Sequence, residues 1–121
     1  MMESLYSSAV LDHFQNPRNA GDLAAATAQV EVTNPVCGDV LRLAARLENG
    51  RVVEARFKTR GCVASIACSS WLTVWMREKT AAELRLLTAE QVANALGGLA
   101  PASFHAAELV CDSLRAILEK L

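Results

Sequence analysis

The sequence predicts an α+β fold, in which helices pack on one face of a three-stranded antiparallel sheet. Three segments alternate apolar and polar residues, as strands with one buried face do: 28–33, 40–47 and 53–60. Apolar residues recur at helical spacing before these strands and again from residue 63 onward. The predicted order is therefore an N-terminal helix, three strands and a C-terminal helical segment.

The N-terminal helix is predicted over residues 4–15, where Tyr6, Val10 and Phe14 recur at helical spacing. Asn16-Pro17 is expected to end it, because a proline cannot continue an α-helix. A connector then leads to the first strand.

The second and third strands are predicted to form a hairpin, because Asn49-Gly50 between alternating segments is the strongest short-range hairpin signal. A two-residue turn would place Leu41 opposite Lys58, which mixes apolar and charged groups on one face. We therefore expect a three-residue loop over 48–50, with the glycine in its left-handed position. The pairs predicted by this register are Leu41 with Phe57, Leu43 with Ala55, and Ala45 with Val53.

The same register places Cys37 opposite Gly61, one residue from Cys62. The two thiols are then expected at the open end of the hairpin, on the order of 5–10 Å apart. Two thiols at this separation indicate either a disulfide or half of a metal site.

Helices are predicted for the rest of the chain. Thr80 starts a short helix by a capping-box spacing to Glu83, and Thr88 caps another that stops at Gly97-Gly98. Pro101 is expected to open the last helix. The helix that begins at residue 63 has an apolar stripe, which consists of Ala64, Ala67, Cys68, Trp71, Leu72 and Trp75. The last helix has its own inner stripe, which consists of Ala107, Val110, Cys111, Leu114, Ile117, Leu118 and Leu121.

Length and composition favour one cytoplasmic domain over residues 1–121, with 52% hydrophobic residues. A net charge of −1 lacks the basic excess of a nucleic-acid-binding surface. No apolar stretch approaches the ~20 residues of a membrane span, and the first residues do not form a signal peptide. We therefore expect no nucleic-acid or membrane partner. Disulfides are disfavoured in the cytoplasm, so neighbouring cysteines there more often bind metal.

Three residues at the open end of the hairpin are candidate metal ligands. Cys37 lies between a proline and a glycine, so it is expected on a tight, exposed loop, with Asp39 two residues further on. Cys62 begins a helix, where unpaired N–H groups favour the thiolate that binds metal. His105 becomes a fourth candidate because this set is short of ligands. Mixed sulfur, oxygen and imidazole ligands suit zinc or an iron–sulfur cluster.

The two remaining cysteines are expected in the core. Cys68 lies within an apolar stripe, where it fills space, although it is a possible helper ligand if the helix starts late or rotates. Cys111 lies on the inner stripe of the last helix, about −120° from His105 around the helix axis. His105 shares its face with Glu108 and Asp112 instead.

Three motifs occur in order along the chain. They are Asp12-His13-Phe14-Gln15-Asn16-Pro17-Arg18-Asn19, then Asn34-Pro35-Val36-Cys37-Gly38-Asp39, then Phe57-Lys58-Thr59-Arg60-Gly61-Cys62 followed by Ile66-Ala67 and Ser69-Ser70. Together they resemble the IscU/NifU-type iron–sulfur cluster assembly scaffold family over nearly the whole chain. The resemblance implies a SufE/NifU-like α+β fold. It also implies a site built from Cys37, Asp39, Cys62 and a C-terminal pair of ligands.

The C-terminal match to this family is incomplete. His105 matches the family histidine, but Ala106 stands where the family has a third ligand cysteine. Cys111 is a poor substitute five residues further on, and Cys68 is a spare thiol on the segment that begins at Cys62. In the family, a DnaK-type chaperone binds the segment that corresponds to residues 99–103. This segment is altered in the present chain, which argues against such a partner.

The resemblance implies a scaffold or carrier rather than a turnover enzyme. Such a protein receives sulfur from a cysteine desulfurase and iron from an iron donor, builds a [2Fe–2S] cluster and passes it to apo iron–sulfur acceptor proteins. Cys37, Asp39, Cys62 and His105 could supply four ligands, with one thiolate fewer than usual. Two alternatives remain open: a zinc-bearing sulfur acceptor that relays persulfide sulfur, and an interaction subunit that has lost metal chemistry.

Overall fold

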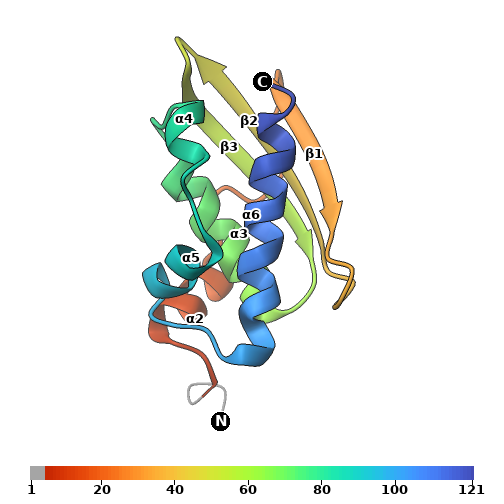
Figure 1. The fold of residues 1–121 in the computed structure, drawn as a ribbon, viewed down its shortest axis with the longest axis vertical. Coiled ribbons are helices and arrows are strands. Elements are labelled where there is room, and N and C mark those ends of the chain that lie inside the picture. The colour runs from red at the N-terminus through yellow and green to blue at the C-terminus, as the bar shows by residue number, and fades with distance from the viewer. Residues whose placement is uncertain (1–4) are drawn as a thin grey trace.

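The computed structural model describes residues 5–121, and its elements follow the predicted order (Figure 1). The helix predicted from Ser4 starts later, at Ser8, because Ser7 caps it by accepting a hydrogen bond from the Val10 N–H at 3.0 Å. Residue 4 itself lies outside the described residues. The elements are α2 (Ser8–Gln15), β1 (Ala28–Thr33), β2 (Val40–Glu48), β3 (Arg51–Arg60), α3 (Val63–Met76), α4 (Ala81–Leu84), α5 (Ala89–Ala95), the 3₁₀ turn η1 (Pro101–Ser103) and α6 (Phe104–Leu118).

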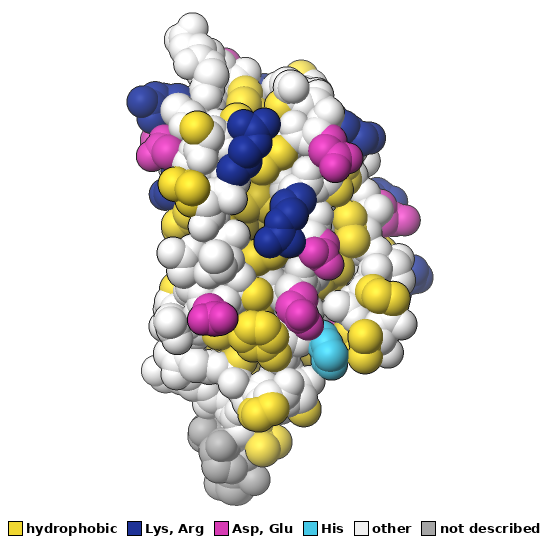
Figure 2. All heavy atoms as spheres, in the orientation of Figure 1, with side chains coloured by type: hydrophobic (Ala, Val, Ile, Leu, Met, Phe, Trp, Pro, Cys, Tyr) yellow, Lys and Arg dark blue, Asp and Glu magenta, His cyan; other side chains and the backbone are white. Residues whose placement is uncertain are grey.

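The strands form one antiparallel sheet in the order β1-β2-β3. Helix α3 packs against β3, and α6 packs against β1 and β2 on the same face (Figure 1). The other face carries charged side chains that pair across strands, as Arg42 does with Glu31 at 3.4 Å. Positive and negative side chains are also interspersed on the face that α6 crosses (Figure 2). The predicted α+β architecture is confirmed.

The predicted hairpin register is wrong by two residues. Next to the turn Glu48 pairs with Arg51, so the connection is the two-residue turn Asn49-Gly50, with both residues at positive φ. An irregularity between Arg46 and Leu47 then shifts the ladder by one residue. This bulge keeps apolar residues on the inner face despite the short turn, and it buries Val52 rather than Val53. The pairs beyond it include Leu41 with Thr59, Leu43 with Phe57, and Ala45 with Ala55.

The corrected register changes which residue faces Gly61. The last pair of the ladder joins Val40 to Arg60, so Asp39, not Cys37, lies across from Gly61. A Cβ atom at Gly61 would come within 2.5 Å of the Asp39 Cγ. A glycine is therefore needed here for the carboxylate to lie across the end of β3.

The core lies between the sheet and α3 and α6. The inner residues of α3 are buried as predicted, while Trp71 and Trp75 are half-buried and stack with their ring centroids 5.9 Å apart. Both predicted capping boxes, at Thr80 and Thr88, are present. Leu121, predicted to lie on the inner stripe, follows the end of α6 and is exposed. None of the helices between residues 5 and 121 is long and apolar enough to cross a membrane.

The first sequence motif fastens α2 and the following connector to α3. The His13 Nδ1 lies 2.8 Å from the Ser70 Oγ, and the Arg18 N–H donates to the same oxygen at 2.8 Å. One residue on, the Asn19 side-chain amide donates to the Thr73 hydroxyl at 3.2 Å. This motif is therefore structural: it anchors the N-terminal part of the chain to the helix that begins at Cys62.

Candidate metal centre

The loop that carries Cys37 joins β1 to β2 and is shaped by Asn34. The Asn34 side chain is buried, and its Oδ1 accepts hydrogen bonds from the N–H groups of Val36 at 2.8 Å and Cys37 at 3.1 Å. The Asn34 backbone closes the loop, because its carbonyl accepts from Gly38 and its N–H donates to the Asp39 carbonyl. Cys37 is therefore held at the tip of a fixed turn, with its side chain exposed.

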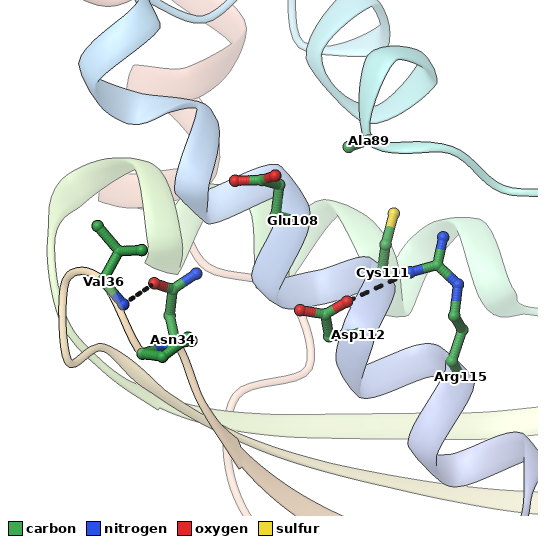
Figure 3. A pocket seen from close by; sticks show the side chains of 8 residues that line it. Asn34, Val36, Ala89, Glu108, Cys111, Asp112 and Arg115 are labelled. Atoms are coloured by element: carbon green, nitrogen blue, oxygen red, sulfur yellow. Dashed lines mark hydrogen bonds and ion pairs between the residues drawn. The ribbon is translucent and has the colours of Figure 1, made fainter.

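Asn34 also ties this loop to the start of α6. Its Nδ2 donates to the His105 carbonyl at 3.4 Å. A hollow of about 300 Å³ opens beside this contact, lined by Asn34, Val36 and residues of α5 and α6 (Figure 3). The Cys37 loop is thus positioned against the first turn of α6, from which the fourth candidate ligand projects.

Cys62 is the N-cap residue of α3, with its thiol exposed. The Cys62 N–H donates to the Asp39 Oδ2 at 3.3 Å, and the Ser65 hydroxyl donates to the same carboxylate oxygen. The Ser65 Oγ also lies 3.3 Å from the Cys62 Sγ. Asp39 lies close to Gly61 and to the first residues of α3. One carboxylate, one thiol and one hydroxyl therefore lie together at this end of the helix.

Asp39 is held as a carboxylate. Its partial burial raises the pKa, but the hydrogen bonds from Ser65 and from the Cys62 N–H, with smaller contributions from the side chains of Cys62 and Cys37, outweigh burial and leave the pKa below its usual value. An ionised carboxylate only accepts hydrogen bonds, so the single Ser65 proton goes to Asp39 and the Cys62 thiol donates to the Ser65 oxygen.

His105 lies on the first turn of α6, and its ring faces along its own helix. The Nδ1 is 3.3 Å from the Glu108 Oε1, and the side chain is 37% exposed. Within residues 5–121, no group of three or more His, Cys, Asp or Glu side chains is arranged to hold a metal ion. The structure joins Asp39 to the start of α3 through the Cys62 N–H, holds Cys37 two residues before Asp39 in the same loop, and leaves His105 engaged with Glu108. Soft thiolates and a carboxylate suit iron or zinc, and their coordination requires side chains to turn.

The comparisons with known proteins identify the family of this chain and agree with its fold. The family model described as the NifU-like N terminal domain matches residues 5–120. The chain belongs to this family. The iron-sulfur cluster assembly scaffold protein IscU 1 of Archaeoglobus fulgidus is 42% identical over 111 residues, which cover 92% of this chain and 72% of the relative. The iron-sulfur cluster assembly scaffold protein IscU of Azotobacter vinelandii is 41% identical over 115 residues, which cover 92% of this chain and 89% of the relative.

Among solved structures, the NifU-like protein (N-terminal) from Brucella abortus superposes with a TM-score of 0.73. The match covers 99% of both chains at 22% identity. At this identity the likeness shows the shared fold alone.

Within this NifU-like domain, the other two cysteines are buried. Cys68 is fully buried, and burial, with smaller effects of Cys62 and Cys111, raises its pKa to about 12. Burial is also the main reason that the pKa of Cys111 rises to about 11. Ala106, where the sequence motif leads us to expect a third cysteine, is 2% exposed. All four cysteines of the chain are free, so the disulfide alternative is not formed here.

Sequence reasoning missed two residues of this site, Asn34 and Ser65. Asn34 belongs to the second sequence motif, but its hydrogen bond from the Cys37 loop to α6 is a tertiary contact that the motif does not predict. Ser65 carries a local signal, because it occupies the third position of the helix that Cys62 begins, one turn from the thiol. Its contact with Asp39 could only follow from the register of β2 and β3.

Proposed function

We propose that this protein is a scaffold or carrier on which an iron–sulfur cluster is assembled and from which the cluster is passed on. The observation that carries the proposal is a pair of exposed, free thiols at one end of the sheet: Cys37 lies two residues before Asp39, and the N–H of Cys62 donates to Asp39, in a chain of the NifU-like family. The relatives named as iron-sulfur cluster assembly scaffolds support the same function. Exposure of both thiols suits delivery and removal of a cargo better than permanent retention.

The residues that would hold the cargo are Cys37, Cys62, Asp39 and His105. The two thiolates supply soft ligands for iron, and the carboxylate and imidazole supply harder ones. A set with one thiolate fewer holds iron less tightly, which favours transfer. Cluster assembly requires the protein to bind the cluster and release it, and no substrate has to be turned over. A scaffold role without enzymatic turnover is therefore the simplest hypothesis.

The proposed partners follow from the cargo. Sulfur would come from a cysteine desulfurase and iron from an iron donor, and apo iron–sulfur proteins would accept the product, a [2Fe–2S] cluster. Both thiols can be reached from solvent, so a desulfurase could deliver sulfur to either. We place this activity in the cytoplasm and in a single domain spanning 1–121.

Anaerobic reconstitution with ferrous iron, a cysteine desulfurase, cysteine and a thiol reductant, which reduces the delivered persulfide sulfur to sulfide, tests the proposal. A protein with visible charge-transfer absorption and acid-labile sulfide is expected, and Cys37→Ala and Cys62→Ala should each abolish both signals. Cys111→Ala is the matched control, because it removes a buried thiol outside the proposed site. A wild-type protein that stays colourless would contradict a scaffold function.

The second candidate function is a zinc-bearing sulfur acceptor, favoured by the mixed donors Cys37, Cys62, Asp39 and His105. One thiolate would then take up persulfide sulfur while zinc holds the remaining ligands. Metal and acid-labile sulfide analysis of anaerobically purified protein separates the two functions. Stoichiometric zinc without sulfide would support the zinc protein, and iron with equimolar sulfide would support the scaffold.

A further inference from the structure

Among residues 5–121, Ser65 is the one residue whose side chain contacts both the Asp39 carboxylate and the Cys62 sulfur. It is 1% exposed, its hydroxyl donates to the Asp39 Oδ2, and its oxygen lies 3.3 Å from the Cys62 Sγ. A buried hydroxyl between a carboxylate and a thiol affects how either of them is presented to a metal.

The position of Asp39 is determined by the start of α3 as much as by its own loop. The side chain of the N-cap residue Cys62 accepts no capping bond from the helix, and the backbone N–H of Cys62 itself donates to the Asp39 Oδ2. A carboxylate at this end of a helix is also favoured by the helix dipole. Gly61 leaves the space for this arrangement. The Asp39 Oδ2 is therefore already bonded to two donors.

We propose that Ser65 is a positioning residue that holds Asp39 against the start of α3, so that metal coordination through the Asp39 Oδ2 competes with this hold. The proposal rests on the proposed function, because it assigns a control on the same site. Asp39 must release the Ser65 hydroxyl to coordinate a metal through Oδ2. Ser65 thereby tunes how tightly the cargo is held.

The first test uses the metal-free protein. In Ser65→Ala, the Asp39 carboxyl loses one of its two donors, so its ¹³C chemical shift should change and the Cys62 amide should exchange at least about fivefold faster. Ser113→Ala is the matched control, since Ser113 is also buried but its hydroxyl donates to a carbonyl of its own helix, that of Leu109. Ser65→Thr keeps the hydroxyl and should behave as the wild type. An unchanged Asp39 signal and unchanged exchange in Ser65→Ala would overturn the proposal.

The second test uses zinc alone, measured by competition with a chelator, and Co²⁺ as a spectroscopic substitute. Ser65→Ala should bind zinc about tenfold more tightly, because a hydrogen bond to a charged group no longer opposes coordination. Its Co²⁺ ligand-field bands should shift as the carboxylate enters the coordination sphere. Both changes should vanish when Ser65→Ala is combined with Asp39→Ala. A gain in affinity that persists in the double variant would overturn the role of Asp39.

The two tests separate this inference from the function on which it rests. A wild-type protein that binds neither zinc nor a cluster would contradict the scaffold function. The metal-free measurement would still confirm or overturn the hold of Ser65 on Asp39.

Discussion

Helix α3 carries two polar clusters, each centred on a buried serine, and they differ in what surrounds the serine. At the start of the helix, Ser65 contacts an exposed thiol and a half-buried carboxylate. In the middle, Ser70 contacts an imidazole and a backbone N–H of segments packed on the helix. The Ser65 cluster comprises Ser65, Asp39 and Cys62, and the Ser70 cluster comprises Ser70, His13 and Arg18.

This difference separates a functional residue from a structural one. The partners of Ser70 are fixed by the packing of α2 and the connector, so its hydrogen bonds have no alternative in the folded protein. The partners of Ser65 include two groups that are candidates to bind a metal, so its hydrogen bonds can be exchanged. We therefore expect the two serines to contribute to different properties: Ser65, by our proposal, to metal binding, and Ser70 to stability.

The largest expected effect is a difference in reactivity between the exposed and the buried thiols. Cys62 and Cys37 are exposed, whereas Cys68 and Cys111 are buried and have pKa values of about 12 and 11. Since the thiolate is the reactive form, the buried pair should react with a disulfide reagent at pH 8 more than about a hundredfold more slowly. Reagent titration followed by mass mapping checks this, with denatured protein as the control in which all four react. Rapid native labelling of Cys68 would contradict the described core.

Ser70→Ala should destabilise the fold by about 2 kcal/mol, because the Arg18 N–H and the His13 ring lose a buried partner together. Urea unfolding measures this loss. Zinc affinity should stay within about twofold of the wild type, since the variant leaves the Ser65 cluster intact. The reverse pattern, with normal stability and altered zinc binding, would remove the distinction between the two clusters.

Gly61→Ala should displace Asp39, because the new Cβ would lie 2.5 Å from the Asp39 Cγ. We expect a loss of about 1–2 kcal/mol from crowding and weakened hydrogen bonds. The same substitution in an Asp39→Ala protein removes the Asp39 Cγ and Oδ2 and leaves the Cβ contact at 2.9 Å, so its cost should fall by about half. A cost that is equal in both backgrounds, measured by urea unfolding, would show that the strain lies elsewhere.

The fold was predictable because its signals are local. Alternation along the strands, the helical stripe of α3 and the capping boxes at Thr80 and Thr88 each depend on neighbouring residues. The hairpin register could not be predicted, because it depends on a bulge between Arg46 and Leu47. This bulge allows a two-residue turn while the apolar side chains of both strands stay on the buried face. That two-residue error hid the approach of Asp39 to Gly61, and with it the contact of Asp39 with Ser65.

The smallest expected effect is the response of the Ser70 cluster to pH. Burial lowers the pKa of His13 below 6.5, and Arg18 lowers it further, while Asp12 opposes them. Because the Ser70 oxygen accepts the Arg18 N–H, its own proton is free for the His13 Nδ1, which accepts only when the ring is neutral. The folded state therefore favours neutral His13.

The sign of the pH effect follows from this preference. The stability that neutral His13 contributes is fully present above pH 6.5 and is lost as the pH falls through the lower folded-state pKa. We expect a loss of less than about 1 kcal/mol, because His13 is only half-buried. Urea unfolding between pH 7.5 and pH 5 measures it, with His13→Gln as the comparison. If that variant lost as much stability as the wild type over this range, the dependence would belong to another group.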